Sequence, residues 1–194
     1  MSQDNEQNAT NKPTLIWIDC EMTGLNPDSE KILEIAVILT DYSLDNTIEG
    51  PSLAIKVDDE LIKNMDDWNT RTHTESGLLD LCQNGISIQE AEKEIIEFVQ
   101  EHHYNFGEHQ RLILAGNSVW HDLIFLKKEM PTLCASHIMP APIMDVTSIS
   151  LNEKMTNPDF TPFIKRRTHR AMDDIKESIG ELRDLRDFEW IDLD

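Results

Sequence analysis

The sequence predicts an α/β fold in which a mixed β-sheet is flanked by helices. Three apolar runs follow one another over short, turn-rich links, which is typical of an antiparallel meander of strands: residues 15–18, 31–40 and 52–57. After a helix-rich stretch, helical and strand-like segments alternate, which is typical of layered α/β proteins. We therefore expect three antiparallel strands followed by alternating helices and strands.

The remaining elements are predicted from apolar spacing and from residues that stop helices. They are a helix over 90–101, a buried strand over 112–115, a helix from Asp122 that Pro131 stops, a short strand over 140–146, and a final amphipathic helix with apolar positions from Met172 to Leu185.

The length and composition predict a single folded domain. A chain of 194 residues with 39% hydrophobic residues is able to bury one core, and no Pro/Gly/Ser-rich linker divides it. Residues 1–13 are polar and lack the apolar region of a targeting signal, so we expect a disordered tail followed by one domain over 14–194. No apolar stretch approaches the roughly 20 residues of a membrane span, which predicts a soluble protein without a membrane partner.

The charge and the cysteines limit the partners and the compartment. With 17 basic and 37 acidic residues, the net charge of -20 disfavours a broad grip on long nucleic acid, which needs many contacts from Lys and Arg to phosphates. A nucleic-acid substrate should therefore be short. The three cysteines, Cys20, Cys82 and Cys134, are odd in number and lack metal-ligand spacing, which favours a reducing compartment, the cytoplasm.

Two carboxylates follow the first apolar run. Asp19 and Glu21 come directly after residues 15–18, and residues two apart in a strand share a face. Carboxylates crowded at the end of a buried strand repel each other and lose hydration, so a cationic partner must offset that cost. A pair of divalent ions is the simplest such partner.

Further acidic residues begin the later helices. Asp122 and Asp174 lie at helix starts, where loops converge at the edge of a sheet. With Asp19 and Glu21 they are able to hold two ions about 3.5–4 Å apart for phosphoryl chemistry, and oxygen ligands favour Mg²⁺ or Mn²⁺. The ordinary alternatives are a strand-end pair neutralised by lysine and a helix N-cap at Asp122.

His169 is the candidate general base for such a site. Its unperturbed pKa near neutrality suits it to take a proton from an attacking water. Five helical steps would place it about 140° from Asp174, so we expect His169 in the loop before the last helix, reaching across to the carboxylates. The alternative is an ordinary exposed loop histidine.

The chain resembles the DEDD exonucleases of the histidine subtype and, within them, the oligoribonucleases. The resemblance runs from Thr14 to about Arg186. It rests on four segments: Trp-Ile-Asp-Cys-Glu-Met-Thr-Gly-Leu at 17–25, Met-Asp-Asp-Trp-Asn-Thr-Arg-Thr-His at 65–73, Gly-Asn-Ser at 116–118, and Thr-His-Arg-Ala-Met-Asp-Asp at 168–174.

This resemblance implies a ribonuclease H-like exonuclease fold, a homodimer, and a 3'→5' exoribonuclease. Its substrates would be short single-stranded RNAs, chiefly dinucleotides, hydrolysed to 5'-mononucleotides by two-metal-ion catalysis. The resemblance also implies substrate contacts: Leu25 as a wedge between two bases, Trp68 and His73 in the base pocket, and Ser118 near the 5' phosphate. Aromatic stacking on bases tolerates any sequence, as such an enzyme requires.

The chain departs from the family pattern before the last predicted strand. The family usually carries a His-Tyr-Arg-Tyr-like stretch there, whose Arg helps to cap the 5' phosphate and whose Tyr reaches the neighbouring subunit. Here residues 140–143 read Pro-Ala-Pro-Ile. The basic cluster Lys165-Arg166-Arg167 precedes His169, and we expect Arg166 and Arg167 to supply part of the phosphate binding. The alternative is a solvated surface cluster.

Two other functions compete with this prediction. A proofreading or DNA-trimming exonuclease of the same superfamily would share the carboxylates and the histidine but would not need the segment 65–73. A non-catalytic RNA-binding module on a nuclease fold would be expected to have lost at least one of the five catalytic positions. All five are present: Asp19, Glu21, Asp122, His169 and Asp174.

Overall fold

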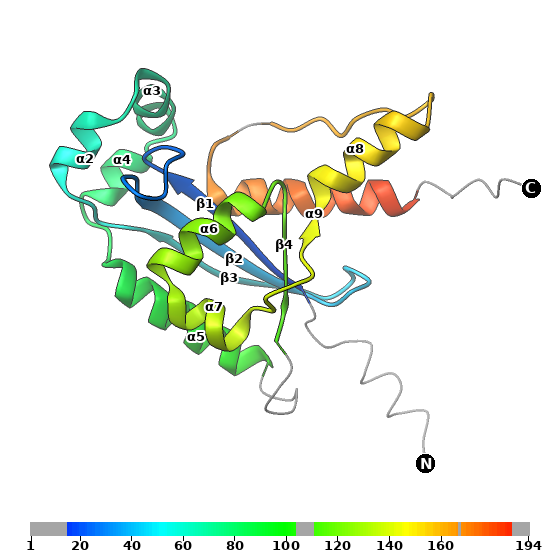
Figure 1. The fold of residues 1–194 in the computed structure, drawn as a ribbon, viewed down its shortest axis with the longest axis horizontal. Coiled ribbons are helices and arrows are strands. Elements are labelled where there is room, and N and C mark those ends of the chain that lie inside the picture. The colour runs from blue at the N-terminus through cyan, green and yellow to red at the C-terminus, as the bar shows by residue number, and fades with distance from the viewer. Residues whose placement is uncertain (1–14, 104–110, 167, 188–194) are drawn as a thin grey trace, which may run out of the picture.

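The computed structural model describes residues 15–103, 111–166 and 168–187, and its centre is a five-stranded sheet (Figure 1). Its strands are β1 (Leu15–Met22), β2 (Ile32–Thr40), β3 (Thr47–Ala54), β4 (Ile113–Gly116) and β5 (Met144–Asp145). They lie in the order β3-β2-β1-β4-β5. β1 pairs antiparallel with β2, and β2 pairs antiparallel with β3. β4 joins the other edge of β1 in parallel, and β5 adds to β4 in parallel. The predicted meander and mixed sheet are confirmed.

Two strands differ from the predicted ranges. β3 begins at Thr47 instead of 52, because the backbone of Asp41 and Asn46 closes a tight hairpin that pairs Thr40 with Thr47 at once. β5 contains only two residues of the predicted range 140–146. Proline has no N–H to donate to a ladder, so the prolines at the start of that range prevent earlier pairing.

Eight helices surround the sheet in the described part of the chain. They are α2 (Asp59–Asn64), α3 (Asp67–Glu75), α4 (Leu78–Cys82), α5 (Ile88–His103), α6 (Trp120–Glu129), α7 (Pro131–His137), α8 (Val146–Thr156) and α9 (Ala171–Asp187). The predicted helices over 90–101, from Asp122 and from Met172 correspond to α5, α6 and α9. Pro131 follows the end of α6 as predicted, and it is also the first residue of α7, where a missing N–H costs nothing.

Side chains alternate between two buried faces of the sheet (Figure 1). Ile16 and Ile18 point to the face that α5, α6 and α7 cover. Leu15 and Trp17 point to the opposite face, where α9 and part of α8 pack. Because the first half of β1 is covered on both sides, Leu15 to Ile18 are all apolar instead of alternating with polar residues. Asp19 and Glu21 continue the odd-numbered series of Leu15 and Trp17, so they belong to the face that α9 covers.

A third cluster closes the end of the sheet where β1 finishes. Leu33 on β2 packs with Met65, Leu78 and Cys82 from the segment that holds α2, α3 and α4. Asp66 begins α3 by accepting the backbone N–H of Asn69 at 2.8 Å, a standard N-terminal cap. α3 is thereby fixed above the end of β1, beside the acidic residues.

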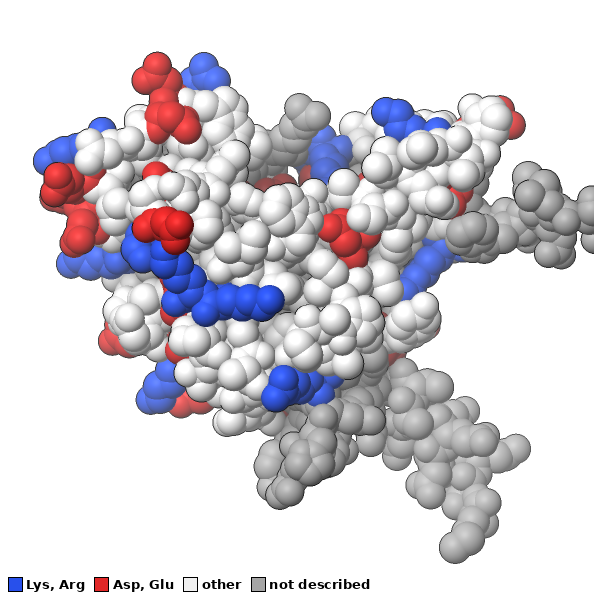
Figure 2. Space-filling model, in the orientation of Figure 1, with Lys and Arg blue, Asp and Glu red and all other residues white. Residues whose placement is uncertain are grey.

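Charges of both signs are spread over the face seen in Figure 2, and basic side chains gather near the end of α6, whose last turn holds Lys127 and Lys128. No described helix combines the length and apolar character needed to cross a membrane. The predicted tail over 1–13 lies outside the described residues.

Candidate active site

The acidic pair of β1 lies within the strand and does not follow it. β1 continues to pair with β2 as far as Met22 and Ile32, so Asp19 and Glu21 are themselves strand residues. Asp19 is opposite Ala36, and Glu21 is opposite Glu34. The strand that begins with the apolar run 15–18 therefore continues through both carboxylates, and their backbone is held by the sheet.

Asp122 reaches β1 because β4 is short. The β1–β4 ladder stops at Trp17 opposite Ala115, so β4 does not pair with the rest of β1 on that side. The Cys20 N–H donates to Asp122 Oδ1 at 2.9 Å, from the first turn of α6. A Cβ at Gly116 would meet Ile18 O at 3.1 Å, so a residue without a side chain permits the close turn that leads there.

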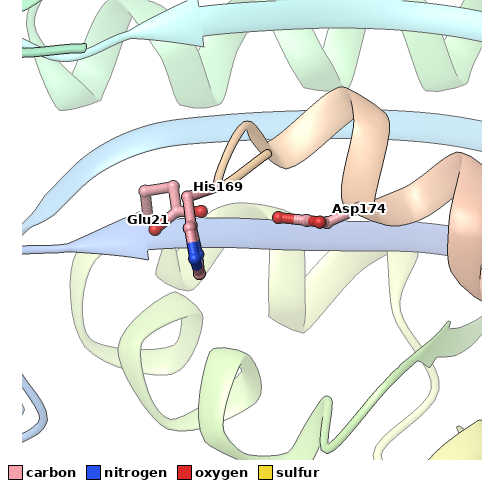
Figure 3. A group of neighbouring side chains, drawn as sticks. All are labelled: Glu21, His169 and Asp174. Atoms are coloured by element: carbon pink, nitrogen blue, oxygen red, sulfur yellow. The ribbon is translucent and has the colours of Figure 1, made fainter. Parts of the chain in front are cut away.

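Asp174 and His169 come from the start of α9. His169 precedes the helix in a left-handed conformation with φ of +53°, as expected for a loop residue. One donor atom each from Glu21, His169 and Asp174 lie within 4.8 Å of one another. Figure 3 shows His169 descending from the loop toward β1, with Asp174 pointing at it from the helix. The structure thus brings together residues from β1 and from the last helix.

Burial and mutual repulsion raise the pKa values of all four carboxyl groups. For Asp19 burial is the largest cause, followed by the charges of Asp122, Glu21 and Asp174, and its pKa lies well above the ordinary value. Burial raises the pKa of Asp122 to about 7 and that of Glu21 to about 8. Burial and the nearby Glu177 raise the pKa of Asp174 to about 6. The site therefore concentrates negative charge that calls for positive partners.

This donor set fits divalent cations. Four carboxylates offer only oxygen ligands, which hard cations such as Mg²⁺ and Mn²⁺ prefer. Two cationic side chains lower the pKa values in the cluster. Lys165 acts on Asp19 and Asp174, and Arg170 acts on Glu21. Their effect is smaller than the increase caused by burial and repulsion. Asp19, Glu21, Asp122 and Asp174 are the residues that would hold the ions.

The predicted base-pocket residues lie beside the carboxylates. The ring of Trp68, 53% exposed, stands edge-on to His169 with 5.7 Å between centroids. His73 is on the buried side of α3, its Nε2 is 3.0 Å from Met22 O, and its Nδ1 is 3.8 Å from Glu21 Oε2. Burial lowers the pKa of His73. The imidazole that lies near Glu21 is therefore neutral. Leu25, 77% exposed, stands in the turn after β1.

Ser118 lies in the loop between β4 and α6, near the start of α8. Its backbone has a positive φ of 48°, and its N–H donates to Asp145 Oδ1 at 3.2 Å. Its hydroxyl is 3.2 Å from that of Thr147. Asn117 also bridges to Glu181 of α9, with its amide 2.9 Å from the carboxylate. These contacts join the loop to the start of α8 and to α9, the two helices that pack on the same face of the sheet.

The basic cluster before His169 is divided. Lys165 pairs with the buried Glu181 at 3.2 Å. Arg166 is exposed, and its backbone N–H donates to Glu177 at 2.8 Å. Arg167 lies outside the described residues.

Glu34 and Arg170 were not predicted as site residues. Glu34 is 1% exposed, and its carboxylate accepts hydrogen bonds from two nitrogens of the Arg170 guanidinium, Nη2 at 2.8 Å and Nε at 3.1 Å. The sequence does contain an indication of this pair: Glu34 is the one charged residue in the apolar stretch of β2, and a charge in such a strand needs a buried partner.

Comparisons with known proteins agree with this geometry. The family model described as exonuclease (RNase_T) matches residues 16–182. An oligoribonuclease of Francisella tularensis subsp. tularensis is 43% identical over 173 residues, covering 89% of this chain and 93% of that protein. An oligoribonuclease of Arabidopsis thaliana is 42% identical over 180 residues, covering 89% of this chain and 76% of that protein.

Solved structures share the fold at low identity. The nuclease domain of 3'hExo, a DEDDh family member, aligns with a TM-score of 0.54 and 16% identity, covering 90% of this chain and 92% of that one. E. coli ExoI aligns with a TM-score of 0.65 and 12% identity, covering 89% of this chain and 40% of that one. The predicted ribonuclease H-like exonuclease fold is confirmed.

The family model covers most of the chain. The match covers nearly the full length of the Francisella relative and three quarters of the Arabidopsis relative. Glu21 and Asp174 of the predicted motif meet near the end of β1. The chain belongs to the oligoribonuclease family of metal-dependent exonucleases.

Proposed function

We propose that this exoribonuclease removes nucleotides from the 3' end of short single-stranded RNAs, chiefly dinucleotides, and releases 5'-mononucleotides. The observation that carries the proposal is the meeting of Glu21, His169 and Asp174 within 4.8 Å, beside Asp19 and Asp122. A hydrolase of phosphodiesters needs a base for water next to a concentrated negative site that binds cations. The curated relatives named oligoribonuclease support the choice of short RNA.

The proposed cofactors are two Mg²⁺ or Mn²⁺ ions, held by Asp19, Glu21, Asp122 and Asp174. When bound, such ions polarise the scissile phosphate and increase the acidity of a water molecule. His169 takes the proton from the attacking water as general base. Because His169 lies in the loop before α9 and not in the helix, its imidazole is able to face the carboxylates.

Substrate contacts are proposed for the residues around this cluster. Leu25 separates the two bases, Trp68 offers an exposed ring for stacking, His73 supports the floor of the base pocket, and Ser118 approaches the 5' phosphate. Both Leu25 and Trp68 are exposed, as a wedge and a stacking platform need to be. A few such contacts suffice for a short substrate, which is how a chain with a net charge of -20 is able to bind RNA.

Arg166 and Arg167 are proposed to supply phosphate contacts in place of the family's missing Arg. The exposure of Arg166 and its place three positions before His169 support this role. Lys165 has a partner of its own in Glu181, so it is a weaker candidate for binding a phosphate.

We further propose a cytoplasmic homodimer. The three cysteines are all unpaired, which suits a reducing compartment. The exposed apolar residues Leu151, at 54%, and Met155, at 78%, lie on α8 and offer a surface for a second copy. Only the two residues of β5 separate α8 from residues 140–143, where the chain differs from the family pattern. Light scattering of the purified protein across a concentration series tests the dimer, and a monomer throughout would contradict it.

The activity is tested with 5'-phosphorylated RNAs of two to seven nucleotides and a matched single-stranded DNA, in Mg²⁺ and in Mn²⁺. We expect the highest initial rate on the dinucleotide and none with Asp19→Ala, which should keep the fold because it removes one of several crowded like charges. A flat length profile or a preference for DNA would contradict the proposed substrate. Metal-dependent turnover by Asp19→Ala would contradict the proposed site.

A further inference from the structure

Arg170 links the two functional residues that come from the start of α9. It directly follows His169, and its carbonyl accepts the backbone N–H groups of Asp173 and Asp174, at 2.9 and 3.0 Å. Arg170 is therefore the N-cap residue, immediately before the first residue of α9. Any shift of Arg170 moves both the loop that carries His169 and the helical turn that carries Asp174.

The buried carboxylate of Glu34 holds Arg170 in place from β2. Besides the guanidinium, Glu34 Oε2 accepts the Ala171 N–H at 3.2 Å, so the same carboxylate satisfies the first free N–H of α9. Two-pronged contact between a guanidinium and a carboxylate fixes orientation as well as distance. The start of α9 is thereby fastened to β2, opposite Glu21 of β1.

The backbone at His169 needs such fastening. A φ of +53° is unfavourable for a residue with a side chain, and a loop in this conformation persists when the surrounding structure holds it. Glu34 stands opposite Glu21 in the β1–β2 register, so the fastening point lies next to a residue of the acidic cluster. The distance between His169 and Glu21 is thus set through Arg170 and Glu34.

We propose that Arg170 is a positioning residue that, through its pairing with Glu34, holds His169 in the orientation needed to act on the attacking water. This inference rests on the general-base role of His169 given under Proposed function. In this role Arg170 acts through His169 and needs no contact with the substrate. Its loss should lower the rate of the chemical step and leave substrate binding nearly unchanged.

The test compares Arg170→Gln with Lys176→Gln as a matched control. Lys176 also joins α9 to the meander, through a 2.9 Å ion pair with Glu49, but that pair is exposed and lies in the second turn of the helix, beyond Asp174. We expect Arg170→Gln to lower kcat on the dinucleotide by about 10- to 100-fold with KM within about threefold. Lys176→Gln should stay within about twofold of the unaltered protein.

The same substitution is then made in a His169→Ala background and measured in single-turnover reactions. If Arg170 acts through His169, Arg170→Gln should cause no further loss there beyond about twofold. An equal loss in both backgrounds, or a rise in KM alone, would overturn the inference while leaving the proposed function intact. Unaltered turnover by His169→Ala would overturn the base role and this inference with it.

Removing Arg170 leaves a buried carboxylate unpaired, which can prevent folding. Arg170→Lys provides the second variant, because it keeps the charge but loses the planar fork of the guanidinium. It should fold, show a smaller loss of kcat than Arg170→Gln, and likewise cause no further loss in the His169→Ala background. Full kcat in folded Arg170→Gln would overturn the proposal.

Discussion

The Asp122 carboxylate accepts the backbone N–H of Cys20 at 2.9 Å, although 102 positions separate the two residues. This single contact joins the first turn of α6 to the open edge of β1. The contact uses Oδ1 of Asp122. Asp122 thus has a structural contact as well as its proposed role as a metal ligand, which makes it a useful position for mutation.

Asp122→Asn should abolish activity and keep the fold. The amide oxygen of asparagine still accepts the Cys20 N–H, whereas the negative charge needed for a cation is lost. We expect turnover to fall at least about 100-fold. Because burial raises the pKa of Asp122 to about 7, removal of its charge should not lower the melting temperature at pH 8. Steady-state kinetics and thermal unfolding test this.

Asp28→Asn is the control for Asp122→Asn. Asp28 is 91% exposed in its side chain and pairs only with Lys128 at the surface, so activity should stay within about twofold. If both variants lose activity equally, the loss does not report on the acidic cluster.

The metal-free protein should lose stability as the pH rises from 6 to 8, in part because of Glu21. Its pKa is raised from 4.5 to about 8 on folding, so the folded state binds more protons than the unfolded state in this range. The free energy of unfolding therefore falls as pH rises. In EDTA, the melting temperature of the unaltered protein should fall by several °C more between these pH values than that of Glu21→Gln. Thermal unfolding of both proteins measures the difference.

Mn²⁺ should reverse this pH effect. Binding to the ionised carboxylates stabilises only the folded state, and it competes with protons. The increase in melting temperature on adding Mn²⁺ should be larger at pH 8 than at pH 6 and should be reduced in Glu21→Gln. An equal increase at both pH values would contradict a carboxylate site.

Trp68→Ala should weaken substrate binding more than catalysis. Stacking of a base on an aromatic ring contributes about 1–3 kcal/mol, so KM for the dinucleotide should rise about tenfold or more. Trp68→Phe keeps an aromatic face and should be closer to the unaltered protein. The opposite order, with kcat lost and KM unchanged, would assign Trp68 to holding His169, whose ring it contacts.

Arg166→Ala combined with Arg167→Ala should weaken binding of a 5'-phosphorylated dinucleotide more than that of its unphosphorylated form. A phosphate contact disappears with the phosphate itself, whereas a general charge effect persists on both substrates. Binding titrations with the two dinucleotides measure this, and equal weakening would place both residues outside the phosphate site.

The sequence by itself determined the meander and the mixed sheet, the helices α5, α6 and α9, and the acidic residues that we propose as metal ligands. Residues 32–39 are apolar at every position but one, so burial on both faces follows from local composition. The Asp-x-Glu motif and the residues before α9 carry the chemistry in their spacing. Both signals are local, and physical preferences that act within a few residues can be predicted from the sequence without a structure.

Only the tertiary structure decided how these parts meet. The strand that holds Asp19 and Glu21 runs on to Met22 because β2 continues to pair with it, and Asp122 reaches Cys20 because β4 ends early. The pairing of Glu34 with Arg170 joins residues 136 positions apart. Such contacts depend on strand register and helix packing across the whole chain, because the energy that selects them comes from partners distant in sequence.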